Sequence, residues 1–585
     1  MILTLSNKVK DLNSLLTNLK KESLFKLEIN FKNDIFVQKN GMDQFISSLS
    51  QFTNLKHLIL NLVKYPDTWD AIQSLSQLIQ SLQKLESISF KSKTKNISNN
   101  EYDYLLSSIG NISNIQNISL AMNYSSQEEH LTIFKYFEQT KSLKNLTFTF
   151  SNNQKNILGE LQFQYNQIAK LNLIDFLVDQ NVIQSLSIIL QNAKELENFE
   201  CQFINSNLSS ILLNQLFSLF HSHPNVQKLT FYISQDILLK EFFSLFKHLE
   251  QMYSLQRLIF ELESGVGFAK NNVSIGYKQY CNKLHLRFKD VQINEKDAQY
   301  ISNYIKNLGN LEKLKIHFDC AVQASSYNIL FQFFKDHKSL RKLILEFQNK
   351  KLTSEQCQAV IQSLKQSKSL KKLKIMLLKT QSEKQVYEVL SQQLSQLENI
   401  VSLKQQILFE KIDISTLFID QIVKNEYLQE LDINFSRLEY DGDYQVKAQQ
   451  LFSMKNLKKL RLKFENQNGR EIEFFKDLDS VKQTNLQELT ISFNQHGVEK
   501  FNEKYANLGK CLNNQRLIKS LTIEVNQNND FESNVILIKE IKSSTMTSFK
   551  VDFGNWNDAW FRELIGKLQQ YSKRKIKRAV SLKFV

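Results

Sequence analysis

A short apolar pattern recurs along the chain and constrains its fold more than any other feature. The pattern starts with Leu, passes through two mostly polar residues to a second Leu, and then places an apolar residue at every second position. Leu340–Phe347 is the clearest copy, and Leu311–Phe318 and Leu457–Phe464 match it closely. Alternation of period two predicts a strand with one buried face. Because the copies recur about every 28–30 residues, the sequence indicates a solenoid of repeated units.

About twenty copies of this pattern can be traced, which is enough for one long continuous core. We therefore interpret 1–585 as a single solenoid, with an N-terminal capping helix region at 1–23 and a C-terminal capping helix and last strand at 554–585. The expected strands lie at 24–31, 55–62, 85–90, 115–122, 143–150, 168–173, 196–203, 226–233, 255–262, 284–288, 311–318, 340–347, 370–377, 428–435, 457–464, 486–493, 518–525, 549–553 and 580–584.

The segments between these strands show helical spacing. Apolar residues between Thr353 and Leu364 fall on one helical face, and Thr353 with Gln356 forms a capping-box start. The segment 294–308 repeats this pattern. The segment 211–220 is apolar on more than one side, so we expect it to be well covered.

Alternating strands and helices predict the shape of the repeat. Strands joined by helical crossovers run parallel, with right-handed connections. Neighbouring strands lie about 4.8 Å apart, whereas packed helices need about 8–10 Å. We therefore expect an α/β solenoid curved into a horseshoe, with parallel strands on the concave face and helices on the convex face.

These units resemble leucine-rich repeats of the ribonuclease-inhibitor type, and the resemblance covers nearly the whole chain. It implies a role in binding other proteins, or in assisting an enzyme as some related repeat proteins do. The family pattern usually places Asn or Cys after the strand, but here that neighbourhood more often holds Phe. We expect these side chains to form a stacked aromatic column, and the turn hydrogen bonds to be made by other groups. The residues are Phe31, Phe150, Phe318, Phe347, Phe464 and Phe493.

Two segments interrupt the repeat. The segment 263–280 lacks a helical pattern and is expected to form a short hairpin or a loop on the rim. In 397–417, Leu397–Ile400 keeps the period but Ile412–Ile414 is the better strand. Irregular units in a solenoid are either binding loops or degraded repeats without a role, and the sequence leaves both readings open.

Composition and cysteine usage indicate the cellular environment. The start of the chain lacks the apolar core of a secretion signal, and no later run is long and uncharged enough to span a bilayer. We therefore expect an intracellular protein without membrane insertion, cytoplasmic or alternatively nuclear. The cysteines are odd in number and scattered, which predicts free thiols in a reducing compartment. They are Cys201, Cys281, Cys320, Cys357 and Cys511.

Motifs for catalysis and cofactors are not found in the sequence. It contains no phosphate-binding loop, no His-Glu-x-x-His, no paired Cys-x-x-Cys and no Gly-x-Ser-x-Gly. His221 and His223 have no nearby carboxylate or Cys, so we expect two surface histidines and no metal site. We predict no enzyme activity, no catalytic residue and no cofactor.

The outward positions of the strands carry the best candidate for a binding site. From the ninth unit these positions become basic, whereas the earlier ones are neutral. The predicted basic stripe consists of Arg257, Lys283, His285, Arg287, Lys313, Lys315, His317, Lys342, Lys372 and Lys374. Stacked at about 4.8 Å per strand, the side chains would reinforce one another. Lysine is abundant in this chain, so a solvated face that binds nothing is the alternative reading.

Three functions remain open at this level. The first is a non-catalytic scaffold or adaptor that binds a protein with an acidic surface through the concave face. The second is an RNA-associated subunit of a ribonucleoprotein or other large assembly. The third is a regulatory accessory to an enzyme, such as a GTPase activator or ligase adaptor. Few aromatic residues face outward, Tyr232 being the clearest, which favours protein over single-stranded nucleic acid. The oligomeric state is left open.

Overall fold

The computed structural model gives the fold over most of the repeats. It describes residues 2–6, 24–31, 47–62, 69–92, 99–123, 136–137, 140, 142–151, 168–176, 180–204, 210–220, 223–234, 249, 252–265, 281–348, 352–378, 384–407, 414–435, 444–465, 485–494, 518–526, 548–553 and 580–584. The chain divides into two compact units, Met1–Val291 (unit 1) and Gln292–Val585 (unit 2).

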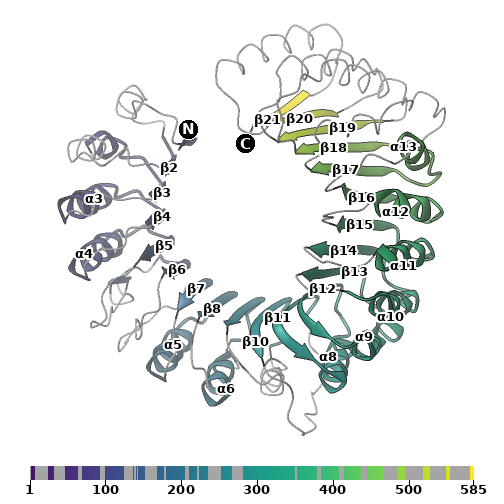
Figure 1. Ribbon diagram of the computed structural model, residues 1–585. Coiled ribbons are helices and arrows are strands. Elements are labelled where there is room, and N and C mark those ends of the chain that lie inside the picture. Colours follow the sequence, from purple (N-terminus) through teal and green to yellow (C-terminus); the bar gives the residue numbers. More distant parts are fainter. Residues whose placement is uncertain are drawn as a thin grey trace, which may run out of the picture. The chain divides into compact units, whose positions relative to one another are not determined.

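Unit 1 contains consecutive parallel strands and the helices that connect some of them (Figure 1). The strands are β1 (Ile2–Ser6), β2 (Lys26–Phe31), β3 (His57–Leu62), β4 (Ser87–Ser92), β5 (Asn117–Asn123), β6 (Asn145–Ser151), β7 (Lys170–Phe176), β8 (Asn198–Ile204), β9 (Lys228–Ser234), β10 (Arg257–Gly265) and β11 (Lys283–Ile293), whose end carries the unit boundary. The helices are α3 (Trp69–Ser81), α4 (Asn99–Gly110), α5 (Gln180–Asn192) and α6 (Ser210–Leu219).

Unit 2 repeats the arrangement. Its strands are β12 (Lys313–Val322), β13 (Lys342–Gln348), β14 (Lys372–Leu378), β15 (Ser402–Ile407), β16 (Glu430–Phe435), β17 (Lys459–Glu465), β18 (Glu488–Asn494), β19 (Ser520–Asn526), β20 (Ser548–Phe553) and β21 (Val580–Phe584). Its helical segments are α8 (Glu295–Asn307), α9 (Ala324–Leu330), the short 3-10 helix η3 (Gln332–Lys335), α10 (Ser354–Lys365), α11 (Lys384–Ser395), α12 (Ile414–Ile422) and α13 (Tyr444–Phe452).

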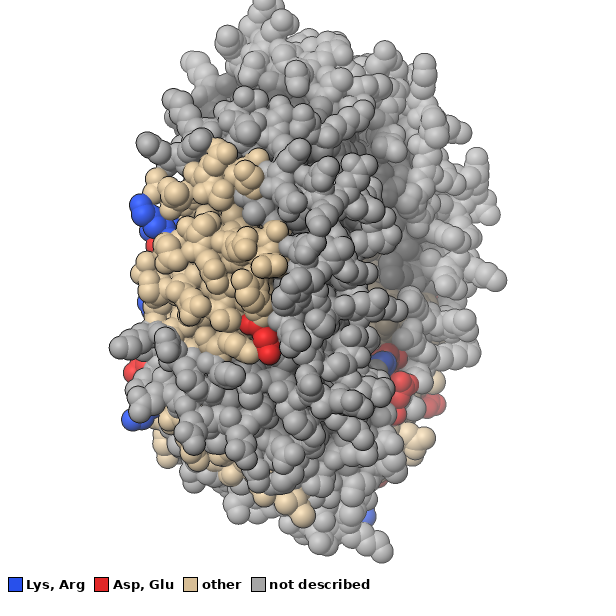
Figure 2. Space-filling view, turned by 90° about the vertical axis from the view of Figure 1, so that its left-hand side faces the viewer, with Lys and Arg blue, Asp and Glu red and all other residues tan. Residues whose placement is uncertain are grey.

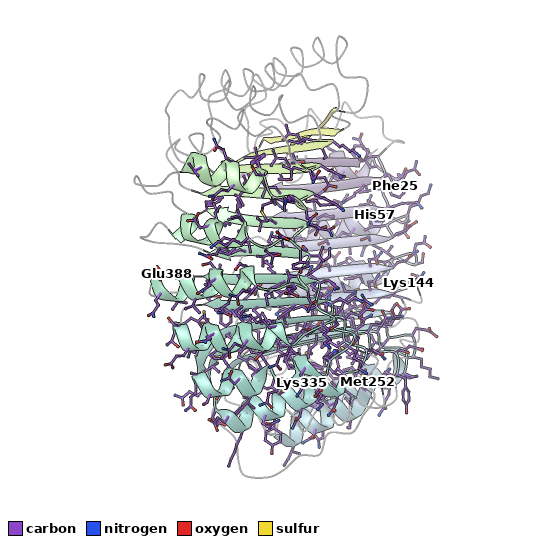
Figure 3. All side chains as sticks on the ribbon, turned by 90° about the vertical axis from the view of Figure 1, so that its right-hand side faces the viewer. Phe25, His57, Lys144, Met252, Lys335 and Glu388 are labelled. Atoms are coloured by element: carbon purple, nitrogen blue, oxygen red, sulfur yellow. The ribbon has the colours of Figure 1, made fainter. Side chains whose placement is uncertain are left out.

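The fold is α/β, with a long parallel sheet built from repeated units. Within unit 2 each strand pairs in register with the next strand, so that Leu343 faces Leu314 on one side and Leu373 on the other. In each unit the helices lie on one face of the sheet and leave the other face open. Figure 3 looks onto the helices of unit 2, with Glu388 of α11 on their outer side. The strands expected from 24–31 to 370–377 and from 428–435 to 580–584 are confirmed, whereas the one expected at 412–414 is wrong.

The core is a layer of leucines between strands and helices. In β13, Leu343 and Leu345 are fully buried, and Ile361 of α10 lies in the same layer. The predicted helices at 294–308 and 353–364 are confirmed as α8 and α10. Thr353 accepts a hydrogen bond from the Gln356 amide and the Gln356 side chain accepts one from the Thr353 amide, which confirms the capping box.

The aromatic column exists in two short stretches. The rings of Phe318 and Phe347 stack at 5.3 Å between centroids, and those of Phe435 and Phe464 stack at 5.1 Å. Between the two pairs the same register position holds Leu377 and Ile407, so aliphatic side chains interrupt the stacking. The side chains of Phe31, Phe150 and Phe493 lie outside the described part of the structure.

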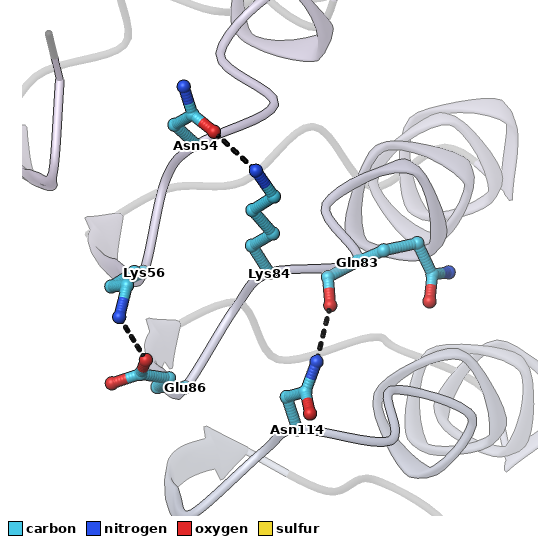
Figure 4. Close-up of polar contacts among 6 residues, drawn as sticks. All are labelled: Asn54, Lys56, Gln83, Lys84, Glu86 and Asn114. Atoms are coloured by element: carbon cyan, nitrogen blue, oxygen red, sulfur yellow. Dashed lines mark hydrogen bonds and ion pairs between the residues drawn. The ribbon is translucent and has the colours of Figure 1, made fainter. Parts of the chain in front are cut away.

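A ladder of short polar side chains connects the turns of successive units. Each member, one residue before the leading Leu or Ile of a strand, donates a hydrogen bond to a carbonyl of the preceding unit; Ser339 donates to the carbonyls of Gly309 at 2.6 Å and Leu311 at 3.1 Å. In unit 1 the Asn114 amide donates to the Gln83 carbonyl, and Lys56 pairs with Glu86 close by (Figure 4). We call this set the turn ladder: Asn114, Ser142, Ser339, Ser369, Asn399, Asn456 and Asn485.

Two irregular segments differ from expectation or fall outside the description. The strand of the unit at 397–417 is β15, and Ile414 begins helix α12 instead of ending a strand. The strand was missed because Gln405 occupies a core position, where it is 3% exposed. Of 263–280, residues up to Gly265 continue β10, and 266–280 lie outside the described residues.

The segment 211–220, His223 and the N-terminal residues 2–6 also differ from expectation. In 211–220 Leu216 and Phe217 are buried but Ile211 is 67% exposed, so the expected coverage does not extend to every apolar residue described there. The expectation of a surface histidine is wrong for His223, which is buried. His223 lies three residues before the leading Val226 of its repeat, as the buried His337 lies three residues before Leu340. His221 is not described. Residues 2–6 form strand β1, in which Leu3 and Leu5 alternate with Thr4 and Ser6.

The termini and thiols complete the comparison. Residues 7–23 and 554–579, where capping helices are expected, lie outside the described residues, whereas the last strand is confirmed as β21. Cys201, Cys281, Cys320 and Cys357 are free and buried, and Cys511 is not described. Within the described residues, none of the helices has the length and apolar character needed to cross a membrane.

Candidate functional site

The candidate site is the helix-free face of the sheet in unit 2, which we call the open face. Side chains project from it in three rows, because parallel strands in register place equivalent residues side by side. The first row is Lys313, Lys342, Lys372, Ser402, Glu430, Lys459 and Glu488. The second row is Lys315, Ile344, Lys374, Lys404, Asp432, Arg461 and Thr490. The third row is His317, Glu346, Met376, Gln406, Asn434, Lys463 and Ser492.

A shallow groove of about 340 Å³ runs across the first two rows. Leu373, Leu403, Leu431 and Leu460, which precede the second-row residues, contribute to its lining. Six basic and three acidic side chains also line it. They are Lys342, Lys372, Lys374, Lys404, Lys459 and Arg461, and Glu430, Asp432 and Glu488.

Several lysines of this face are paired with a carboxylate from the next strand or the next but one. Within the first row, Lys372 lies 3.5 Å from Glu430, and Lys459 lies 2.9 Å from Glu488. Lys404 pairs with Asp432 in the second row. The groove therefore carries charges of both signs with a basic excess.

Glu346 forms the most buried charge cluster of the open face. Its carboxylate lies 2.9 Å from Lys315 Nζ and 3.2 Å from His317 Nδ1. Burial alone would raise the pKa of Glu346, but the hydrogen bonds from His317 and Lys315 lower it to about 2. This carboxylate is therefore ionised throughout the physiological range.

Glu430 shows the same balance at the groove. Partial burial would raise its pKa, and the hydrogen bond from Ser402 together with the charge of Lys372 outweighs burial and lowers it. Ser402 lies between Lys372 and Glu430 in the first row, so this small residue lets the two charged side chains meet across β15.

Two groove lysines differ from the rest. The ammonium groups of Lys342 and Lys374 have neither an ion pair nor a hydrogen bond with any residue that the structure describes. Lys374 is half-buried, and burial followed by the nearby charge of Lys404 lowers its pKa. The groove thus holds an ammonium group without a partner of its own.

The sequence-predicted stripe divides between the two units. In unit 1, Arg257 and Lys283 face each other at the starts of β10 and β11, and both are exposed. His285 and Arg287 follow at alternate positions of β11 and are half-buried. These four share one face of their sheet.

In unit 2 the stripe is not continuous. Lys313, Lys342 and Lys372 form an unbroken run in the first row, but Ile344 separates Lys315 from Lys374 in the second. In the third row His317 is only 7% exposed and contacts Glu346, so it adds little to the surface charge; the list of predicted residues also omitted the acidic partners and Lys404. Lys404 was omitted because β15 was not recognised. Glu430 and Asp432 are identifiable in the sequence as interruptions of the basic pattern, whereas Glu346 and Glu488 were not recognised as partners.

The helix-bearing side carries a different surface. Figure 2 shows this side for part of unit 1, where the described surface is mostly uncharged, with few basic side chains at its margin. Helices α3 and α4 contain no Lys or Arg. Dense charge is thus a property of the open face of unit 2 rather than of every surface.

No group of three or more His, Cys, Asp or Glu in the described ranges is arranged to hold a metal ion. A scan against protein-family models and a search of curated proteins each found no match.

Proposed function

We propose that the chain is a non-catalytic scaffold of the leucine-rich-repeat type, which binds a partner protein on the open face of unit 2. The observation that carries this proposal is the groove of unit 2, where charged rows of fixed spacing surround unpaired lysines. A wide, shallow, mixed-charge surface suits a protein partner, because complementary charges fix register and orientation.

The charge pattern favours protein over nucleic acid. A phosphate backbone gains affinity from contiguous cations, whereas Glu430, Asp432 and Glu488 interrupt the cations of this groove. The run of Lys313, Lys342 and Lys372 is the feature that would serve an RNA-associated role, and it covers only three strands.

Affinity purification of the full chain with a groove variant tests the proposal. Lys342→Glu with Lys374→Glu reverses the two unpaired lysines, and recovery of specific partners should fall at least about tenfold, because like charges across an interface repel. Lys338→Glu with Lys368→Glu is the matched control: both lysines are exposed in turns outside the groove and the charge change is the same.

Equal recovery of partners by the wild type and the groove variant would show that the open face of unit 2 does not bind them. Ribonuclease treatment before elution distinguishes the RNA-associated alternative, since partners held through RNA are then lost from all forms of the chain.

A further inference from the structure

The ammonium group of Lys374 contacts no carboxylate of the described residues, unlike several other lysines of the groove. Lys372, Lys404 and Lys459 each contact a carboxylate of a neighbouring or next-neighbouring strand. Lys374 has the charges of Glu346 and Asp432 nearby, but Glu346 already contacts Lys315 and His317, and Asp432 contacts Lys404. The nearest internal anions are therefore already engaged.

The surroundings of Lys374 are partly apolar. Ile344 is its register partner on β13 and Met376 lies two positions along β14, so both share its face of the sheet. These side chains are 8% and 9% exposed. A half-buried ammonium beside apolar groups loses part of its hydration, and an external anion would compensate for that loss.

The chemistry of the groove limits what this anion can be. A carboxylate on a protein segment places a single negative charge at Lys374. Other residues of that segment, uncharged or basic, can then face Glu430 and Asp432. A polyphosphate chain would bring further negative charges against those acidic residues.

We propose that Lys374 binds a carboxylate of an acidic segment of a partner protein, beside the nearly buried Ile344 and Met376. This inference rests on the proposed function. The new pair would extend across the interface the lysine–carboxylate pairing that the open face already uses between its own strands.

Fluorescence anisotropy of the full chain with labelled peptides tests the assignment. One decapeptide carries four Glu and two Leu, and its twin carries Gln at each Glu position. Wild type should bind the Glu peptide at least about tenfold more tightly, and Lys374→Gln should lose about tenfold of that affinity, as expected for one charge-assisted contact. Lys371→Gln is the matched control, since Lys371 is exposed on the same segment and does not line the groove.

Several outcomes would overturn the assignment. They are equal binding of the two peptides, equal loss in the Lys371 and Lys374 variants, or no binding of the Glu peptide at millimolar concentration. A decauridine RNA that binds more tightly than the Glu peptide, with the same dependence on Lys374, would reassign the site to nucleic acid. Lys374→Arg keeps the charge and should retain most of the affinity, which separates loss of the cation from loss of folding.

The two proposals fail separately. If Lys374→Gln still recovers partners while the double charge reversal does not, only the Lys374 assignment is wrong. If partner recovery survives the double reversal, the proposed function is wrong, whatever the peptides show.

Discussion

At the scale of the residue, the Asp297 carboxylate is buried at the start of helix α8, where its ionisation lowers the stability of the folded protein. It is fully buried in the first turn of α8, where Oδ2 accepts a hydrogen bond from the Asn294 amide at 2.9 Å. Oδ1 has no hydrogen-bond partner among the described residues. Burial raises the pKa of Asp297 to about 6, although the Asn294 amide opposes this.

Replacing this carboxylate should stabilise the protein at neutral pH. A raised pKa in the folded state means that the unfolded chain ionises first, so stability falls as pH rises from about 4 to about 6. Asp297→Asn removes that loss and should gain about 1–2 kcal/mol at pH 7.5, with no pH-dependent gain remaining at pH 3.5. Urea unfolding at the two pH values measures the difference.

The neighbouring Glu295→Gln is the control, because it removes an exposed carboxylate from the same turn. It should change stability by less than about 0.5 kcal/mol. A gain for Asp297→Asn that is equal at both pH values would show that ionisation is not its cause.

At the scale of the elements, the turn ladder connects the turns that precede successive strands. Ser and Asn are short enough to reach a carbonyl one unit back without leaving the turn. Thr140 and Asn425 make similar bonds two residues before their ladder positions, to the carbonyls of Gly110 and of Leu397. Backbone carbonyls in tightly stacked turns are thereby satisfied, as buried polar groups require.

Removing one member of the ladder should have a measurable effect. Ser339→Ala deletes the bonds to Gly309 and Leu311 and should cost about 1–2 kcal/mol in urea unfolding. Ser325→Ala is the control, since Ser325 is exposed on α9 and should change stability by less than about 0.5 kcal/mol. Equal effects of the two substitutions would contradict a stabilising role for the ladder.

Strand positions follow from the sequence because burial imposes strict alternation, and the positions that failed have specific causes. Strand β15 was not predicted because the polar Gln405 occupies a core position and breaks the alternation of apolar residues. The rows of the open face were predictable from period and register. The pairing of Lys315 with Glu346 was not, because diagonal contacts depend on side-chain conformations that one sequence does not determine.

On the scale of the whole molecule, stability is expected to be local. Each strand–helix repeat packs mainly on the repeats beside it, so a defect in one repeat should affect only nearby repeats. Phe347 is a suitable probe, because it is 5% exposed and stacks on Phe318.

Hydrogen exchange of a Phe347→Ala variant measures that distance. Loss of a buried aromatic ring costs about 3–5 kcal/mol, so amides of β12, β13 and β14 should exchange much faster. Amides of β17 and β18 should keep their wild-type rates. Tyr427→Ala, which removes a 53% exposed ring, should leave all of these strands unchanged. Uniformly faster exchange throughout unit 2 would instead indicate one cooperative block.

The turn ladder also has a consequence for how such a chain can change its length. Every rung joins a donor to an acceptor one period earlier, so the duplication or loss of an entire period leaves all rungs complete. A deletion of part of a period would change the donor–acceptor spacing of the rung that spans it and break that rung. Selection on these small hydrogen bonds therefore favours growth in multiples of the repeat.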